Sequence, residues 1–168
     1  MDDFNAFIAD VLYHMTAYNG SDTRRIGHAL KVFGYALIIG GQLPTFERES
    51  LLTAAVLHDI GIHNAEQKHH SSAGEFQELE GPPVARTILS TLDAPAPLAA
   101  RVCYLVGHHH SYTKIDGADF QALIEADFLV NIEEDGLSGE AAASIGKKYF
   151  RTQKGKQLLV NLFGIVEQ

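Results

Sequence analysis

Apolar residues recur at helical spacing almost from one end of this chain to the other, and no segment alternates apolar and polar residues as a half-buried strand does. In residues 51–57, which read LLTAAVL, the apolar surface extends nearly all round, as in a helix that is buried on every side. The expected helices cover about residues 4–19, 22–39, 45–59, 72–81, 82–92, 98–108, 119–132, 138–150 and 155–166. The predicted fold class is therefore all-α, with about seven to nine helices.

Several helix boundaries depend on local capping signals. Asp22 and Asp119 are expected to cap the helices that follow them, since a short carboxylate accepts a hydrogen bond from a free backbone N–H. Residues 72–75, Ser-Ala-Gly-Glu, have the pattern of a capping box. Pro82 and Pro83 suit the first turn of a separate helix. Gly61 is expected to end the buried helix and to begin an irregular segment that carries histidines.

Length, charge and cysteine content limit the class of protein. A chain of 168 residues fits one domain with its own core, so we expect a single domain over residues 1–168. The 13 Lys and Arg against 21 Asp and Glu give a formal net charge of −8, which argues against nucleic acid as a partner. The single Cys103 allows no internal disulfide. The N-terminus does not resemble a signal peptide and no apolar run is long enough for a membrane span, so a cytoplasmic location without a membrane partner is expected.

The pair His58-Asp59 follows directly on the most apolar helix of the chain. A buried, uncompensated carboxylate costs several kcal/mol, and a divalent cation is one compensating group. A plainer interpretation also exists, in which His58 interacts with the helix dipole and Asp59 begins a turn. The pair alone does not separate the two interpretations.

Two further polar residues interrupt otherwise apolar helices. His28 lies among Ile26, Ala29 and Phe33, and Asp127 lies in the stretch ALIEADFLV. Together with His58 and Asp59 they supply two nitrogen and two oxygen donors from three predicted helices. Such a mixed set suits a borderline divalent metal ion, namely Mn, Fe, Co, Ni or Zn.

The order His28, His58-Asp59, Asp127, with the sequence HDIG at residues 58–61, resembles the HD-domain metal-dependent phosphohydrolases of the HDIG variety. The resemblance covers a core of about residues 24–132, and the helices of about residues 138–166 complete the domain. It implies an all-α HD-type fold and a divalent metal ion held by these four residues. It also implies hydrolysis of a phosphoester or phosphoanhydride in a small phosphorylated metabolite, for which we expect a nucleotide.

Additional histidines lie between the HD pair and Asp127, at His69-His70 and in the run 108–110. Binuclear members of the superfamily place one extra histidine ligand in each of these regions, with the aspartate of the HD pair bridging the ions. Spacing favours His70 and His108, while His69 and His109 are close rivals, so one or two ions per chain are expected. The alternative is that all of these histidines lie on a solvated rim.

In a phosphohydrolase, a metal ion polarises the phosphoryl group and lowers the pKa of water from about 15.7 toward 7. Asp59 and His58 are the predicted catalytic residues, with Asp59 within reach of the proton of the attacking water. Arg24, one turn before His28, and Lys68 are candidates for binding substrate phosphate, although each also suits an ordinary solvated cation.

Two other function classes fit the same residues. The set of four histidines and two aspartates also resembles the di-iron oxygenases built on this fold, and a non-catalytic module that binds a nucleotide or a metal and signals to a partner is a third possibility. No Gly-Tyr-Pro follows the histidine run, and Ile62 stands where a lysine often follows HDIG. The first departure argues against a cyclic-dinucleotide phosphodiesterase, and the second removes one expected phosphate contact.

Overall fold

A computed structural model describes residues 2–165 and confirms the all-α fold class. Over this range the chain forms nine helices and no strand. The helices are α1 (Asp2–Asn19), α2 (Thr23–Ile39), α3 (Thr45–Leu57), α4 (Ile62–His69), α5 (Gly74–Thr91), α6 (Ala96–Val106), α7 (Ala118–Glu134), α8 (Gly139–Tyr149) and α9 (Gln153–Phe163). None of these helices is long and apolar enough to cross a membrane.

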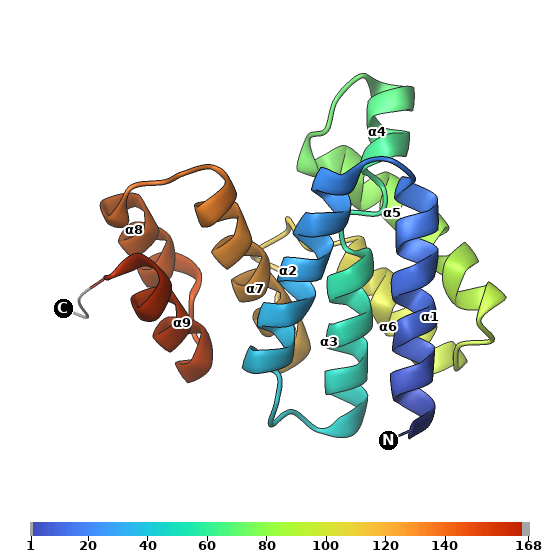
Figure 1. Ribbon diagram of the computed structural model, residues 1–168, viewed down its shortest axis with the longest axis horizontal. Coiled ribbons are helices and arrows are strands. Elements are labelled where there is room, and N and C mark those ends of the chain that lie inside the picture. The colour runs from blue at the N-terminus through green and yellow to red at the C-terminus, as the bar shows by residue number, and fades with distance from the viewer. Residues whose placement is uncertain (1, 166–168) are drawn as a thin grey trace.

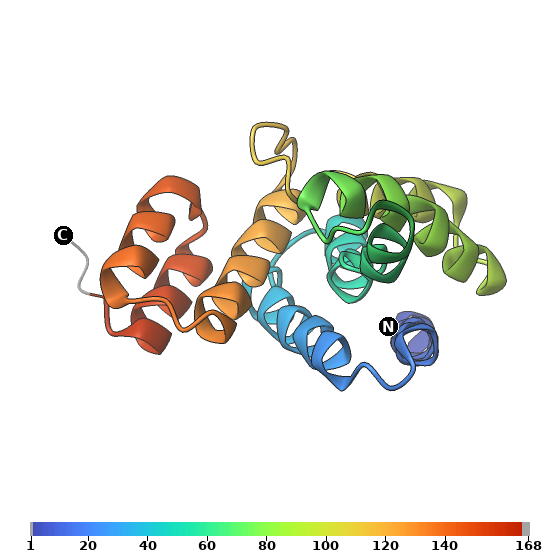
Figure 2. The same cartoon turned by 90° about the horizontal axis from the view of Figure 1, so that it is seen from above.

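Helix α3 is the centre of the fold, as its apolar sequence predicts. Its last eight residues, from Ser50 to Leu57, are all buried, and α1, α2, α6 and α7 pack around it (Figure 1). Helices α4 and α5 pack together beyond the end of α3. Seen from above, α8 and α9 form a pair on the outer side of α7, at the opposite end of the molecule from α1 (Figure 2). The C-terminal end of α3 meets both α2 and α7, and these two helices also pack against each other.

Some predicted boundaries are correct and others are wrong. Asp22 caps α2, accepting a hydrogen bond from the Arg25 backbone N–H at 3.1 Å. Asp119 does not cap α7 but lies in its first turn, where its buried carboxylate binds Arg101 at 2.7 Å. The predicted capping box is also absent, because α5 begins after Ala73 and no side chain caps it.

The two helices expected at 72–81 and 82–92 are one continuous helix, α5, with both prolines inside it. Close packing at Gly81 accounts for this continuity. A Cβ at Gly61 would overlap the backbone nitrogen of Gly81, and a Cβ at Gly81 would lie 2.7 Å from the Val106 side chain. This contact holds α5 against the start of α4, which forms where an irregular segment was expected. Tertiary packing thus outweighs the two backbone donors that the prolines remove.

A buried carboxylate attaches the C-terminal pair of helices to α7. Glu125 has no exposed surface and accepts hydrogen bonds from the backbone N–H of Arg151 at 2.6 Å and of Thr152 at 2.9 Å. The Thr152 hydroxyl donates to the same carboxylate and also caps α9. These bonds satisfy the oxygens of the Glu125 side chain inside the protein, as burial of a polar group requires.

Candidate metal centre

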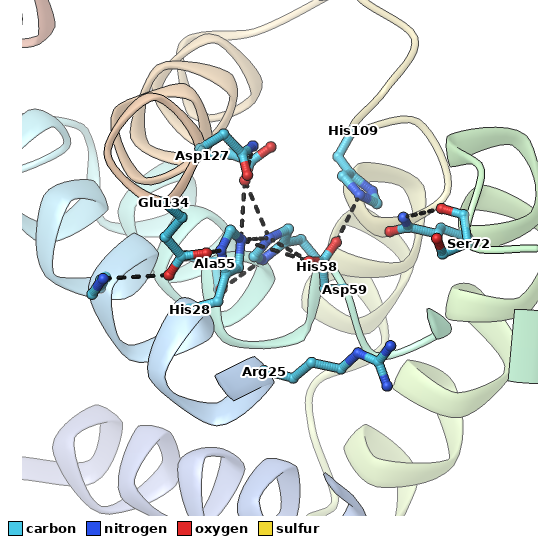
Figure 3. A network of polar contacts seen from close by, with 12 residues as sticks. Arg25, His28, Ala55, His58, Asp59, Ser72, His109, Asp127 and Glu134 are labelled. Carbon is cyan, nitrogen blue, oxygen red and sulfur yellow. Dashed lines mark hydrogen bonds and ion pairs between the residues drawn. The ribbon is translucent and has the colours of Figure 1, made fainter. Parts of the chain in front are cut away.

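Three helices bring the predicted histidines and aspartates to one point in the core. His28 extends from α2, His58 and Asp59 follow the last residue of α3, and Asp127 extends from α7 (Figure 3). The side chains of His28, His58 and Asp127 are 9%, 0% and 8% exposed, whereas that of Asp59 is 24% exposed. These polar side chains therefore lie in the core, at the end of α3, where apolar residues would otherwise be expected.

The donor atoms of these residues lie close to one another. The Nε2 atoms of His28 and His58 are 3.2 Å apart, and Asp127 Oδ1 lies 3.2 Å from the first and 3.6 Å from the second. Asp59 Oδ2 is 3.6 Å from both Nε2 atoms. Ligand atoms bound at about 2.1 Å to one ion are separated by roughly 3.0 to 3.4 Å. His28, His58 and Asp127 are thus nearly at the separation that a single cation requires, and Asp59 lies beside them. We call these four residues the first donor group.

Hydrogen bonds on the far side of each ring determine which nitrogen faces inward as an acceptor. His28 Nδ1 lies 3.0 Å from Glu134 Oε2, and His58 Nδ1 lies 2.9 Å from the carbonyl oxygen of Ala55, so each Nδ1 carries the proton that it donates. When a ring carries only this proton, the lone pair of its Nε2 faces the other ring and carboxylate oxygens. Such a group of facing acceptors is unfavourable unless a positive charge lies among them, and a divalent cation satisfies all of them together.

Without a cation, the cluster retains protons strongly. Burial by itself lowers the pKa of His28, but the bond to Asp127 and the charges of Asp59 and Asp127 outweigh burial and raise this pKa to about 9. Burial by itself raises the pKa of Asp127, but His28 and His58 hold it below its usual range. The negative potential that favours these protons also favours a bound cation.

A second group of donors adjoins the first. Asp59 Oδ1 lies 3.3 Å from Nε2 of His109, and donor atoms of Asp59, His109 and His110 all lie within 4.8 Å of one another. His109 is fully buried, its Nδ1 lies 2.8 Å from the Val106 carbonyl oxygen, and its Nε2 has no hydrogen-bond partner among the described residues. Burial lowers the pKa of His110 to about 4, so this ring is neutral near neutral pH. Asp59 therefore has one oxygen toward each donor group.

The other predicted site residues lie apart from these donors. His108 Nδ1 lies 2.8 Å from the Tyr104 carbonyl oxygen and its ring stacks on the Tyr104 ring, while His70 is exposed and ends α4 with a positive φ of 54°. The Lys68 ammonium lies 2.6 Å from Glu80 Oε2, and the His69 ring also binds Glu80. The structure places His109, rather than His108, beside Asp59.

Residues that the sequence interpretation missed lie around the cluster. Asn131 donates to Asp127 Oδ1 at 2.9 Å, and Glu134 accepts from His28. These two residues follow Asp127 by four and seven positions, so they share its helix face, and this spacing was a signal available in the sequence. Gln77 on α5 is buried, and its Oε1 lies 3.3 Å from His110 Nε2. No spacing rule connects Gln77 to the other residues of the site.

A cavity of about 280 Å³ opens beside the first donor group. Both His28 and Asp59 line it, together with Arg24 and Arg25 from the start of α2 and Glu66 from α4. The Arg24 side chain is exposed and makes no hydrogen bond or ion pair with any residue from 2 to 165, whereas the Arg25 side chain binds Asp22 and Glu66. A ligand in this cavity would contact the candidate metal centre directly.

Fold and site together define a class: an all-helical protein whose central helix ends in a His-Asp pair and meets a histidine and an aspartate from two neighbouring helices. The chain belongs to the HD domain family, because the family model described as HD domain matches residues 25–150, well over half of its length. This match includes all four residues of the first donor group and confirms the resemblance to HD domains. No curated protein and no solved structure matches the chain significantly.

Proposed function

We propose that this protein is a metal-dependent phosphohydrolase that uses water to cleave a phosphoester or phosphoanhydride in a small phosphorylated metabolite. The observation that carries the proposal is the convergence of acceptor atoms from His28, His58 and Asp127 at separations of 3.2 to 3.6 Å, with Asp59 Oδ2 at 3.6 Å from both histidines. Membership of the HD domain family supports the same class of reaction, since such domains are in general metal-dependent hydrolases.

These four residues hold one divalent ion of the group Mn, Fe, Co, Ni or Zn in this proposal. Asp59, His109 and His110 hold a second ion where one is present. His109 and His110 thereby take the places that spacing had suggested for His108 and His70. A divalent cation at this position supplies positive charge that stabilises a phosphoryl group under attack and lowers the pKa of water toward 7.

The protein side chains provide orientation and proton transfer. Arg24, free of partners among the described residues, binds a phosphate oxygen at the cavity entrance. Asp59 accepts the proton of the attacking water. His58, whose Nε2 lies 3.6 Å from Asp59 Oδ2, would help to hold the same cation. The water oxygen bonds to phosphorus, the bond from phosphorus to the leaving oxygen breaks, and the leaving oxygen takes up the proton that Asp59 accepted. Lys68, bound to Glu80, has no part in this scheme.

The test is turnover of p-nitrophenyl phosphate by the full chain after EDTA treatment and after addition of Mn²⁺ or Co²⁺. We expect no turnover with EDTA and recovery with metal, and a loss of about 100-fold or more in His58→Ala and Asp59→Ala. Glu140→Gln, an exposed change on α8, serves as the control for protein handling. Full metal-dependent turnover in both site variants would contradict the proposal.

The di-iron oxygenase remains the alternative, because the second donor group adjoins the first through Asp59. It requires two irons per chain and consumption of dioxygen with an organic substrate. Metal-dependent phosphate release without oxygen consumption distinguishes the hydrolase from it.

A further inference from the structure

The cavity beside the candidate metal centre is the space available to the leaving group of a phosphate ester bound there. His28 and Asp59 form one side of it, and residues from the start of α2 and from α4 form the remainder. Figure 3 shows the Arg25 side chain extended below Asp59 along this space. A phosphate that reaches the donor cluster therefore has its leaving group within this cavity, and the cavity lining selects the leaving group.

The lining offers little surface on which a nucleobase could stack, because its planar side chains, His28, Arg24 and Arg25, are assigned to the cation, to phosphate and to the ion pairs with Asp22 and Glu66. Ile62 is its one apolar residue, and within the described chain no phenylalanine or tyrosine contributes to it. Three aromatic residues of the α7 and α8 region pack instead against one another, since the Phe128 and Tyr149 rings stack at 4.7 Å and Tyr112 contacts both. Bases are held in proteins mainly by stacking on aromatic or apolar faces.

Hydrogen-bond acceptors dominate the polar part of the lining. Arg25 is already engaged, at 2.9 Å from Asp22 Oδ2 and 2.6 Å from Glu66 Oε1. This ion pair orients the Glu66 carboxylate, whose side chain is 45% exposed, and leaves its second oxygen free of any bond within residues 2–165. Glu134 and the side-chain carbonyl of Asn131 add further acceptors. Acceptors of this kind match the hydroxyl donors of a sugar or other polyol.

We propose that the substrate is a phosphate monoester of a small polyhydroxylated compound, of the sugar phosphate class, and that Glu66 binds its hydroxyl groups. This inference rests on the proposed phosphohydrolase function and replaces the expectation of a nucleotide. Specificity follows because a nucleobase finds no phenylalanine or tyrosine of the described chain in the cavity and Ile62 as its one apolar side chain, whereas hydroxyl groups find carboxylate and amide acceptors.

Ribose 5-phosphate and AMP form a matched pair for the test, since they share the scissile phosphate ester and differ by the base. We expect the metal-loaded full chain to hydrolyse ribose 5-phosphate with kcat/KM at least about tenfold higher than AMP. Equal values, or a preference for AMP, would overturn the inference.

Glu66→Gln tests the assigned residue. We expect the preference for ribose 5-phosphate over p-nitrophenyl phosphate to fall several-fold, because the amide replaces a charged acceptor with a weaker one. Glu140→Gln on α8, which is exposed and does not line the cavity, is the matched control and keeps the wild-type preference. A preference in Glu66→Gln equal to that of wild type would overturn the role of Glu66.

Failure of the inference is distinct from failure of the proposed function. Hydrolysis of p-nitrophenyl phosphate without hydrolysis of sugar phosphates refutes the substrate class and leaves the phosphohydrolase intact. Absence of hydrolysis of every phosphate ester, in the metal-loaded protein, refutes both.

Discussion

Substitution of Glu134 tests whether metal binding depends on the orientation of the His28 ring. Its carboxylate lies 3.0 Å from His28 Nδ1 and is 20% exposed, so solvent screens the interaction only in part. A hydrogen bond to a charged group contributes about 1.5–3 kcal/mol, and loss of an outer partner of a metal ligand weakens metal binding by about 10- to 100-fold. We therefore expect Glu134→Ala to raise the dissociation constant for Mn²⁺ or Co²⁺ by about 10- to 100-fold.

Competition with a chromophoric chelator measures this dissociation constant without reference to activity. Glu134→Gln retains an acceptor for the N–H of His28 and is expected to fall between Glu134→Ala and wild type. Glu133→Gln is the matched control, because Glu133 pairs with Lys31 at 2.9 Å, as Glu134 does at 3.3 Å, but makes no bond to His28. If Glu133→Gln and Glu134→Gln weaken metal binding equally, the effect is one of net charge and the orienting role of Glu134 is refuted.

Three further predictions concern protons and packing. Because the pKa of His28 is about 9 without metal and that of His58 is also raised, metal binding near neutral pH is expected to release at least about one proton and to strengthen as pH rises toward 9. Calorimetry in buffers of different ionisation enthalpy measures the release, and affinity independent of pH would contradict this. Glu125→Ala leaves the backbone donors before α9 unsatisfied and is expected to lower the free energy of unfolding by about 2–4 kcal/mol in urea titrations, with metal affinity retained. Gly61→Ala is expected to cost about 1–3 kcal/mol by the same measurement, because the added Cβ meets the backbone of Gly81, and an unchanged midpoint would show that α4 and α5 separate easily.

The helical fold was predictable because it depends on local spacing. The apolar run in α3 and the Asp22 cap of α2 are set by neighbours within a few residues, and both predictions are confirmed. The predicted helix break before Pro82 and Pro83 was wrong, because the continuity of α5 depends on a contact between Gly81 and Gly61, which are twenty positions apart in the sequence. Local signals cannot include such a contact.

The four residues brought together in the first donor group were found from polar residues in apolar helices, a signal that is also local. Local sequence signals could not show whether His108 or His109 lies beside Asp59. Helix α6 ends at Val106, and beyond a helix end the direction of a side chain no longer follows the helical period. The partner of His28, Glu134, lies 106 positions away, and only the packing of α2 on α7 places it there.

The metal content of the protein, purified without chelator and measured by elemental analysis, is the most direct test of the central claim. We predict about one equivalent of a borderline divalent ion per chain, or two if the second donor group is filled, and loss of the bound metal in Asp127→Ala. The Glu140→Gln control is expected to match wild type. A wild-type protein that carries no metal, and takes up none on dialysis against Mn²⁺, Co²⁺ or Fe²⁺, would contradict the account.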